Sequence, residues 1–332
     1  MTEHKPENTS VTRPGARRLS PTYILSEYGI MLAFLVLVVG LSFASPYFLR
    51  TNNILNVLRQ ASINALLSIG MTYVILTGGI DLSVGSGLAF GGIVAASLAS
   101  DAMSGTVYHP LLAASAGLLG GVVLGAVNGL FVAKWRMPPF VVTLGMLSMA
   151  RGFTFIYTDG MPVPRIDESF LFFGQGVPMG VPFPVIILAI VFALSWVVLY
   201  KTRYGRYIYA VGGNEKSAKI SGVNTRLIIF TVYVISGFLS ALGGIILTAR
   251  TTAGLPQAGL AYELDAIAAV VIGGTSLSGG QGSLTGTLTG ALLIGVINNG
   301  LDLLGVSSYF QQVIKGAIII GAVLLDSFRK KD

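Results

Sequence analysis

The chain has 332 residues, of which 53% are hydrophobic and only 11% are charged, and its mean hydropathy is +0.77. This composition excludes an ordinary soluble globular domain and is typical of a membrane protein. The net charge of +7 does not indicate a nucleic-acid partner, because the positive residues flank apolar blocks, as in the cytoplasmic loops of membrane proteins. The absence of cysteine excludes disulfides and thiolate metal sites.

The apolar residues form blocks long enough to cross a hydrocarbon core of about 30 Å as helices. The blocks cover approximately residues 28–44, 61–79, 84–100, 111–133, 140–157, 183–200, 227–249, 264–277, 285–301 and 310–326. The eighth block is short and could be re-entrant, so nine or ten spans are expected. The predicted fold class is therefore an all-α membrane protein with about ten transmembrane helices.

Polar sequence is expected at both ends of the chain. Residues 1–26 are polar and are expected to form a disordered cytoplasmic tail. Residues 27–327 are expected to form one transmembrane domain, followed by a second cytoplasmic tail at 328–332. The first apolar block is too long and too far from the start for a typical cleaved signal peptide, so we expect it to remain as an anchor.

The charges of the loops predict the orientation of the chain. With the N-terminus inside, the basic loop at 201–226 falls in the cytoplasm, and the more acidic loop at 158–182 falls outside. Arg50 and Arg59 fall on the outer side against this rule, and an interfacial helix over 51–60 would account for them. The pattern predicts that both termini are cytoplasmic.

Glycines predict close helix packing. The fourth block contains glycine at every fourth position, at Gly117, Gly121, Gly125 and Gly129.

Two glycine-rich segments of the chain are similar to each other: GGIDLSVGSG at 78–87 and GGTSLSGGQG at 273–282. A parallel internal repeat and chance explain this weak similarity about equally well. Leu277–Gln281 spells LSGGQ, the signature of ABC ATPases. We interpret it as a glycine turn, because the sequence has no G-x-x-x-x-G-K-[ST] phosphate loop.

The loop at 201–226 concentrates basic residues in a chain with few charges. They are Lys201, Arg203, Arg206, Lys216, Lys219 and Arg226. Gly213 or Asn214 is expected to start a short helix, with Glu215 in its first turn. Ala218 and Gly222 share the face of Glu215, and Gly222 is expected to end the helix. This helix is either a docking element for a cytoplasmic partner or part of a solvated connector.

Polar side chains inside the apolar blocks are candidates for the lining of a translocation pathway. They are Asn64, Asn128, Asp265, Asn298 and Asn299. Burying a polar side chain in lipid costs free energy unless the side chain is hydrogen-bonded or hydrated. Each of these residues therefore either forms a hydrogen bond to a neighbouring helix or replaces water around a hydroxylated solute. Arg151 is a further polar residue of this kind, and Asp81 is expected to cap the third block. The isolated histidines and the lack of a catalytic constellation predict neither a metal site nor an enzyme.

Four strings of the sequence resemble the monosaccharide permeases of ABC importers, and ribose-type permeases most of all. They are AVGGNEKSAKISGVNT at 210–225, GGIDLSVGS at 78–86, YELDAIAAVVIGGTSLSGGQGSLTGTLTGALLIGVINNGL at 262–301 and LLGVSSYFQQVIKGAIII at 303–320. The resemblance covers about residues 28–326. It places the chain among the membrane-spanning subunits of the branched-chain amino acid/ribose-type permease family.

The resemblance implies a permease that moves a monosaccharide, such as ribose, across the bacterial inner membrane. It implies a separate cytoplasmic ATPase that binds ATP and Mg²⁺, a periplasmic sugar-binding protein and a second permease subunit, which is expected to be an identical chain. No cofactor is expected on this chain, and lipid is its other partner.

The implied ATPase-coupling residues are Gly213, Asn214, Glu215, Ala218 and Gly222. Lys216 and Ser217 stand where the family's coupling motif has two alanines. The alternative is an ion-coupled secondary sugar transporter, which Asp81 and Asp265 motivate.

Overall fold

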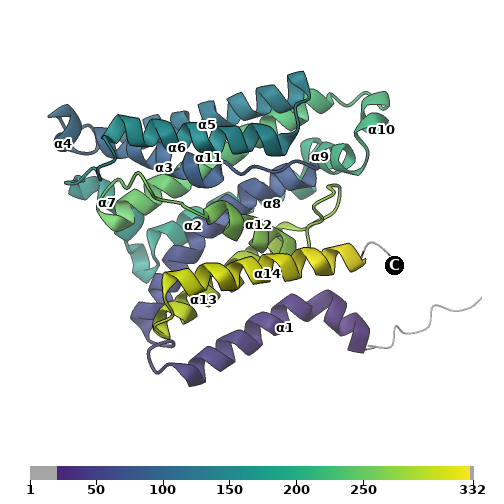
Figure 1. The fold of residues 1–332 in the computed structure, drawn as a ribbon, viewed down its shortest axis with the longest axis horizontal. Coiled ribbons are helices and arrows are strands. Elements are labelled where there is room, and N and C mark those ends of the chain that lie inside the picture. The colour runs from purple at the N-terminus through teal and green to yellow at the C-terminus, as the bar shows by residue number, and fades with distance from the viewer. Residues whose placement is uncertain (1–20, 330–332) are drawn as a thin grey trace, which may run out of the picture.

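The computed structural model describes residues 21–329, which form a bundle of roughly parallel helices (Figure 1). Its helices are α1 (Pro21–Ala44), α2 (Thr51–Leu76), α3 (Val84–Leu98), α4 (Asp101–Ser104), α5 (Pro110–Trp135), α6 (Pro139–Thr158), α7 (Glu168–Gln175), α8 (Phe183–Lys201), α9 (Arg203–Gly213), α10 (Glu215–Ile220), α11 (Thr225–Thr251), α12 (Tyr262–Ile272), α13 (Leu284–Leu303) and α14 (Ser308–Arg329), with a 3-10 turn at Pro178–Gly180. Extended pairing within 21–329 is limited to two isolated bridges, Ser100 to Ile166 and Val163 to Gly254. The predicted all-α class is confirmed.

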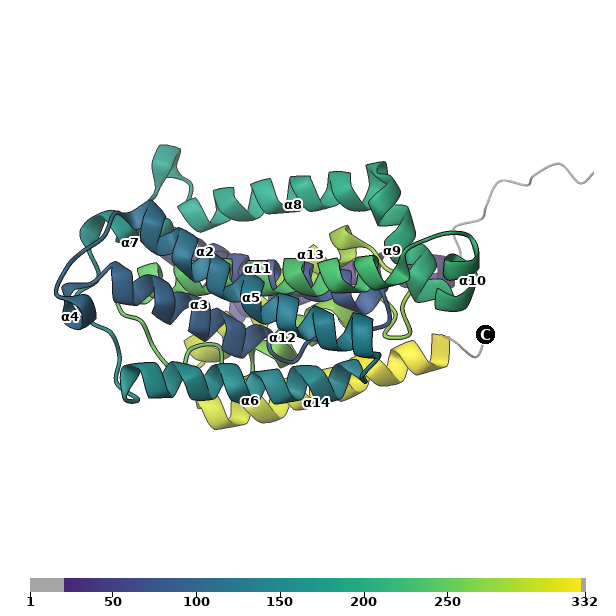
Figure 2. The ribbon, with the colours of Figure 1, turned by 90° about the horizontal axis from the view of Figure 1, so that it is seen from above.

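The two ends of the bundle differ. Figure 2 shows α9 and α10 at one end, which we call the α10 end, and α4 and α7 at the other, which we call the α7 end. The helix α1 begins, and α14 finishes, at the α10 end (Figure 1). The chain therefore enters and leaves the described bundle at the same end.

Five helices of the described chain are long and apolar enough to cross a membrane: α5, α6, α8, α11 and α13. The predicted total of ten spans is not confirmed. The helices α3 and α12 have only 15 and 11 residues. At 1.5 Å per residue, α12 rises about 16 Å, roughly half of a hydrocarbon core. The short eighth block therefore does not cross the membrane as a helix by itself.

Several predicted boundaries differ from those of the structure. Residues 51–60, expected as a separate interfacial helix, are the first turns of the continuous α2. The helix α1 begins at Pro21, so residues 21–26 of the predicted tail are helical, and 1–20 lie outside the described residues. At the other end, α14 continues to Arg329, and 330–332 lie outside the described residues.

The centre of the bundle is built by glycine. The helix α11 packs against α2, α3 and α5. A side chain at Gly121 would clash with the backbone carbonyl of Gly237, and one at Gly125 with that of Tyr233. The two backbones approach this closely because both helices present small residues where they cross. The predicted packing stripe of the fourth block is confirmed, and it fixes α5 and α11 as one unit.

The segment between α11 and α12 is irregular and packs against α3 and α6. It runs inward from Thr252, and Gly259 packs against the backbone of Gly85 in the first turn of α3. Arg151 of α6 donates to the carbonyls of Pro256 and Ala258, both at 2.7 Å. Irregular backbone is tolerated at membrane depth only where protein or a wet cavity satisfies it. Arg151 supplies two of the required donors.

Candidate coupling and translocation sites

The predicted loop at 201–226 is a pair of helices, α9 and α10. The sequence analysis missed α9, whose amphipathic run RYGRYIYAVGG buries Gly205, Ile208 and Val211 against the bundle. The helix α10 begins as expected. The side chain of Asn214 accepts from the N–H of Ser217 at 2.9 Å, which satisfies one of the free donors of the first turn.

The end of α10 also follows the prediction. Gly222 has a φ of +84°, a left-handed conformation that glycine adopts without strain. The N–H of Val223, the next residue, donates to the carbonyl of Ala218 at 3.0 Å and closes the turn. The short helix is thus fixed at both ends by local sequence.

Glu215 ties α10 to two other elements. It accepts from the guanidinium of Arg136 at 3.3 Å and from the hydroxyl of Thr225 at 3.0 Å. Arg136 lies at the end of α5, and the buried Thr225 begins α11. The carboxylate in the first turn of α10 therefore joins the short helix to the central pair of helices.

The surface of α10 differs from that implied by the family resemblance. Ala218 is buried, whereas Ile220 is 88% exposed. Lys216 and Lys219 are also exposed. Ile220 is therefore an exposed apolar side chain on an otherwise polar helix. The sequence analysis did not single out Ile220. The signal that could have found it is its position between two polar residues, Lys219 and Ser221, in a helix of only six residues.

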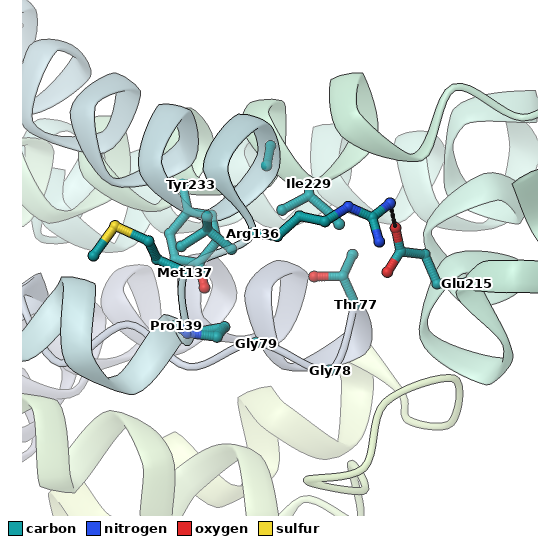
Figure 3. A pocket seen from close by; sticks show the side chains of 11 residues that line it. Thr77, Gly78, Gly79, Arg136, Met137, Pro139, Glu215, Ile229 and Tyr233 are labelled. Atoms are coloured by element: carbon teal, nitrogen blue, oxygen red, sulfur yellow. Dashed lines mark hydrogen bonds and ion pairs between the residues drawn. The ribbon is translucent and has the colours of Figure 1, made fainter.

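A cavity of about 220 Å³ lies between α10, the α5–α6 turn and the α2–α3 loop (Figure 3). It is lined by Thr77, Gly78, Gly79, Val132, Ala133, Arg136, Met137, Pro139, Glu215, Ile229 and Tyr233. The ion pair of Arg136 and Glu215 lies on one side, and the ring of Tyr233 reaches toward Gly79 (Figure 3). The cavity therefore separates the first turn of α10 from the α2–α3 loop and the end of α5.

The two glycine turns that echo each other in sequence lie against the end of α9. The N–H of Gly280 donates to the carbonyl of Leu76 at 2.9 Å. A side chain at Gly212 would clash with both of these groups. The LSGGQ segment is a turn, as expected, with positive φ at Gly279 and Gly280. We call the contact of Leu76, Gly212 and Gly280 the glycine junction.

The polar residues predicted to line a pathway do not form one cluster. Asn128 is buried and donates to the hydroxyl of Ser83 at 2.9 Å. The carboxylate of Asp81 accepts from the hydroxyl of Ser83 at 2.6 Å and from that of Ser236 at 2.7 Å. Asp81 also accepts from the N–H of Ser83, but Ser83 is the N-cap residue of α3, so Asp81 does not itself cap the helix as expected. The buried carboxylate therefore has three donors around it, all from within the bundle.

A second polar cluster joins α12, α13 and α14. Asp265 and Asn298, both predicted as pathway residues, lie together here: Asn298 Nδ2 is 3.4 Å from Asp265 Oδ2. The ammonium of Lys315 lies 2.9 Å from the same oxygen. Lys315 was not singled out from the sequence, since a lysine near the start of a terminal helix is normally an interfacial residue.

The other two predicted pathway residues lie elsewhere. Asn299 exchanges two side-chain hydrogen bonds with Asn53, at 2.8 and 2.9 Å, and so ties α13 to the start of α2. Asn64 is buried within α2, where its backbone carbonyl accepts from the hydroxyl of Ser68. The contact of Asn299 has the form of an interhelical bond, which was the alternative explanation for each of these residues.

Comparisons with known proteins agree with the resemblance. Residues 53–323 match the family described as branched-chain amino acid transport system / permease component. The chain is 48% identical over 323 residues to the ribose import permease protein RbsC of Escherichia coli (strain K12), covering 96% of this chain and 99% of the relative. It is 49% identical over 310 residues to RbsC of Bacillus subtilis (strain 168), covering 93% and 94% of the two chains.

A relative with a different printed sugar is also similar. The chain is 42% identical over 308 residues to the D-allose transport system permease protein AlsC of Escherichia coli (strain K12), covering 92% of this chain and 93% of the relative. No solved structure matches the chain. Together with the five described helices that are long and apolar enough to cross a membrane, the matches show that this multi-pass membrane protein belongs to the branched-chain amino acid transport system permease family.

Proposed function

We propose that the chain is the membrane-spanning subunit of an ABC importer that carries a monosaccharide inward across the bacterial inner membrane. The observation that carries the proposal is the similarity along almost the whole chain to import permeases whose names specify ribose, D-allose and galactose. These names share a chemical class, a neutral sugar with several hydroxyl groups. Ribose is the leading candidate because the relatives named for it are the most similar of these.

The energy source is proposed to be a separate ATPase that binds ATP and Mg²⁺ and docks at the α10 end. Two observations support this docking: the exposed Ile220 on α10, and the basic residues Lys216 and Lys219 beside it. The α10 end is then the cytoplasmic end, which agrees with the concentration of Lys and Arg in 201–226. Both termini of the described bundle lie at this end (Figure 1).

The glycine junction offers a route from the ATPase to the membrane core. At Gly212 the backbone of α9 contacts the backbones of Leu76, at the end of α2, and Gly280, in the α12–α13 turn, with no side chain between them. A displacement of α9 would therefore displace both of these segments. A displacement of α10 pulls on α5 and α11 through Glu215. Closure of two ATPase subunits under two such permease chains would therefore act on helices that hold the proposed pathway.

At the α7 end, a periplasmic sugar-binding protein is proposed to deliver the substrate. The α7 end carries the loop 158–182, which was predicted to lie outside from its charges. The proposed pathway starts there and passes the polar residues of α12 and α13. Asn64, Asn128 and Asn299 are retained as proposed lining residues for conformations in which their helices separate.

The test is reconstitution of the chain in proteoliposomes with its ATPase and binding protein. We expect uptake of D-ribose, or of D-allose or D-galactose, only when ATP, the ATPase and the loaded binding protein are all present. Uptake by the permease chain alone, abolished by an uncoupler and insensitive to ATP depletion, would instead establish the ion-coupled alternative. A requirement for ATP without any requirement for the binding protein would contradict the proposed delivery step.

A further inference from the structure

The helix α12 begins inside the bundle, and its first turn holds a charged cluster. The irregular segment at 252–261 leads directly into α12, which begins at Tyr262 and has Asp265 in its first turn. Lys315 lies two turns from the start of α14, about 10 Å inward from the α7 end of that helix. The cluster therefore lies within the membrane-spanning part of the bundle, on the side from which the proposed substrate arrives.

The cluster is incompletely satisfied. Asp265 is 2% exposed and Asn298 is 4% exposed. Asp265 Oδ2 accepts from Lys315 at 2.9 Å and lies 3.4 Å from Asn298 Nδ2. The other polar atom of the amide, Asn298 Oδ1, is buried without a hydrogen-bond partner among the described residues. A buried acceptor of this kind costs free energy until a donor reaches it.

Lys315 is the most exposed residue of this cluster. Its side chain is 20% exposed, and a lysine ammonium carries three donors, of which Asp265 uses one. The site thus offers a free acceptor on Asn298 and spare donors on Lys315, and both residues contact the same oxygen of Asp265. A pair of neighbouring hydroxyl groups complements this arrangement, because each hydroxyl both donates and accepts.

We propose that Asp265, Asn298 and Lys315 form a hydroxyl-binding subsite for a neutral polyhydroxylated solute between α12, α13 and α14. One hydroxyl donates to Asn298 Oδ1, and its neighbour accepts from Lys315 while Asp265 holds that ammonium in place. This inference rests on the proposed function, and it assigns the substrate contact to one place in the chain. Lys315 is the residue that the pathway prediction lacked.

A purely structural ion pair behaves differently from a subsite when its charges are removed. Replacing a buried pair by apolar residues of similar volume is often neutral or stabilising. Replacing Asn298 by leucine also removes its unpartnered oxygen, so the variant is not expected to lose thermal stability. The variants Asn298→Leu and Asp265→Leu/Lys315→Leu therefore separate a role in packing from a role in substrate passage.

The experiment uses the permease reconstituted with its ATPase and binding protein, with D-ribose as the probe. The matched control is Thr289→Val on α13, because the Thr289 hydroxyl donates to the carbonyl of Thr285 on its own helix. We expect both variants to lower the uptake rate about tenfold or more, which corresponds to the loss of one good substrate contact. ATPase stimulation by the loaded binding protein and the melting temperature stay at the wild-type level, as in the control.

Two results would overturn the subsite. One is wild-type uptake in the double variant, which would make the ion pair a structural element only. The other is loss of uptake only in parallel with ATPase stimulation and melting temperature in both variants. A wild-type complex that takes up no sugar with ATP would instead reject the proposed function itself, so the two failures are distinguishable.

Discussion

Arg136, where α5 ends, donates to Glu215 in the first turn of α10 at 3.3 Å. The two residues are separated by 79 positions in sequence. Their ion pair lies on one side of the cavity next to α10, with side-chain exposures of 55% and 39% (Figure 3). It joins the proposed ATPase-binding helix to the helix that carries the glycine stripe, and so to the centre of the bundle.

Reversing the charge at this contact should uncouple the two parts with little loss of stability. Solvent-exposed ion pairs contribute about 1 kcal/mol or less, so the melting temperature of Glu215→Lys should stay close to that of the wild type. ATPase stimulation and uptake should fall severalfold, because the introduced ammonium would repel Arg136 and could not accept from Thr225. The reversed pair Arg136→Glu/Glu215→Arg should recover part of the coupling. Equal activity in Glu215→Lys and the wild type would exclude the link.

Ile220 is expected to be an anchor of the ATPase contact. The variant Ile220→Asp should reduce co-purification of the ATPase, with a loss of about 2 kcal/mol that is typical of a central interface residue. The insertion and melting temperature of the isolated permease should not change, since the side chain is 88% exposed. Ile220→Val is the matched control and should retain binding. Undiminished co-purification of the Asp variant would place the docking surface elsewhere.

Gly222 is required for its backbone conformation. Nothing lies within 4 Å of a Cβ built at this position, so a larger residue meets no obstacle. Its φ of +84° nevertheless strains any residue with a Cβ, by roughly 1–2 kcal/mol. We expect Gly222→Val to disorder the end of α10 and lower ATPase stimulation, and Gly222→Asn to have a smaller effect because asparagine tolerates this region better. Hydrogen exchange at 214–223 would report the disorder, and equal exchange in all three proteins would refute it.

The glycine junction can be tested with two adjacent glycines. A Cβ at Gly212 would overlap the Leu76 carbonyl and the Gly280 N–H, whereas one at Gly213 has nothing within 4 Å. Overpacking of this kind costs about 1–3 kcal/mol, so Gly212→Ala should lower the melting temperature and Gly213→Ala should not. Thermal unfolding of both variants in detergent is the measurement. Similar melting temperatures would mean that the end of α9 shifts freely.

Arg151 is expected to hold the irregular segment in place. Its guanidinium donates to the carbonyls of Pro256 and Ala258, and Arg151→Met would leave both without this donor. Each lost partner of a buried acceptor costs about 1–3 kcal/mol. We expect a lower melting temperature and faster proteolysis within 252–261, and Arg151→Lys should lie between the two because its ammonium is a single compact donor group. Wild-type protection of this segment in Arg151→Met would show that other donors suffice.

Much of α10 and of the helix packing could be predicted from local sequence. The cap at Asn214, the acid at Glu215 and the stop at Gly222 act within a few residues, so they work in any surrounding structure. The glycine spacing of α5 likewise appears in the sequence itself. The continuity of 51–60 with the rest of α2 could not be predicted, because a polar start to a long helix and a separate interfacial helix have the same composition.

The sequence by itself determined the all-α membrane class, the family and the short helix with its caps, because hydropathy and capping act over neighbouring residues. Only the tertiary structure decided which polar residues meet. It brought Lys315 to Asp265, paired Asn299 with Asn53, and buried Ala218 while exposing Ile220. These relationships depend on how helices distant in sequence cross, and that depends on close packing of their surfaces rather than on any local pattern.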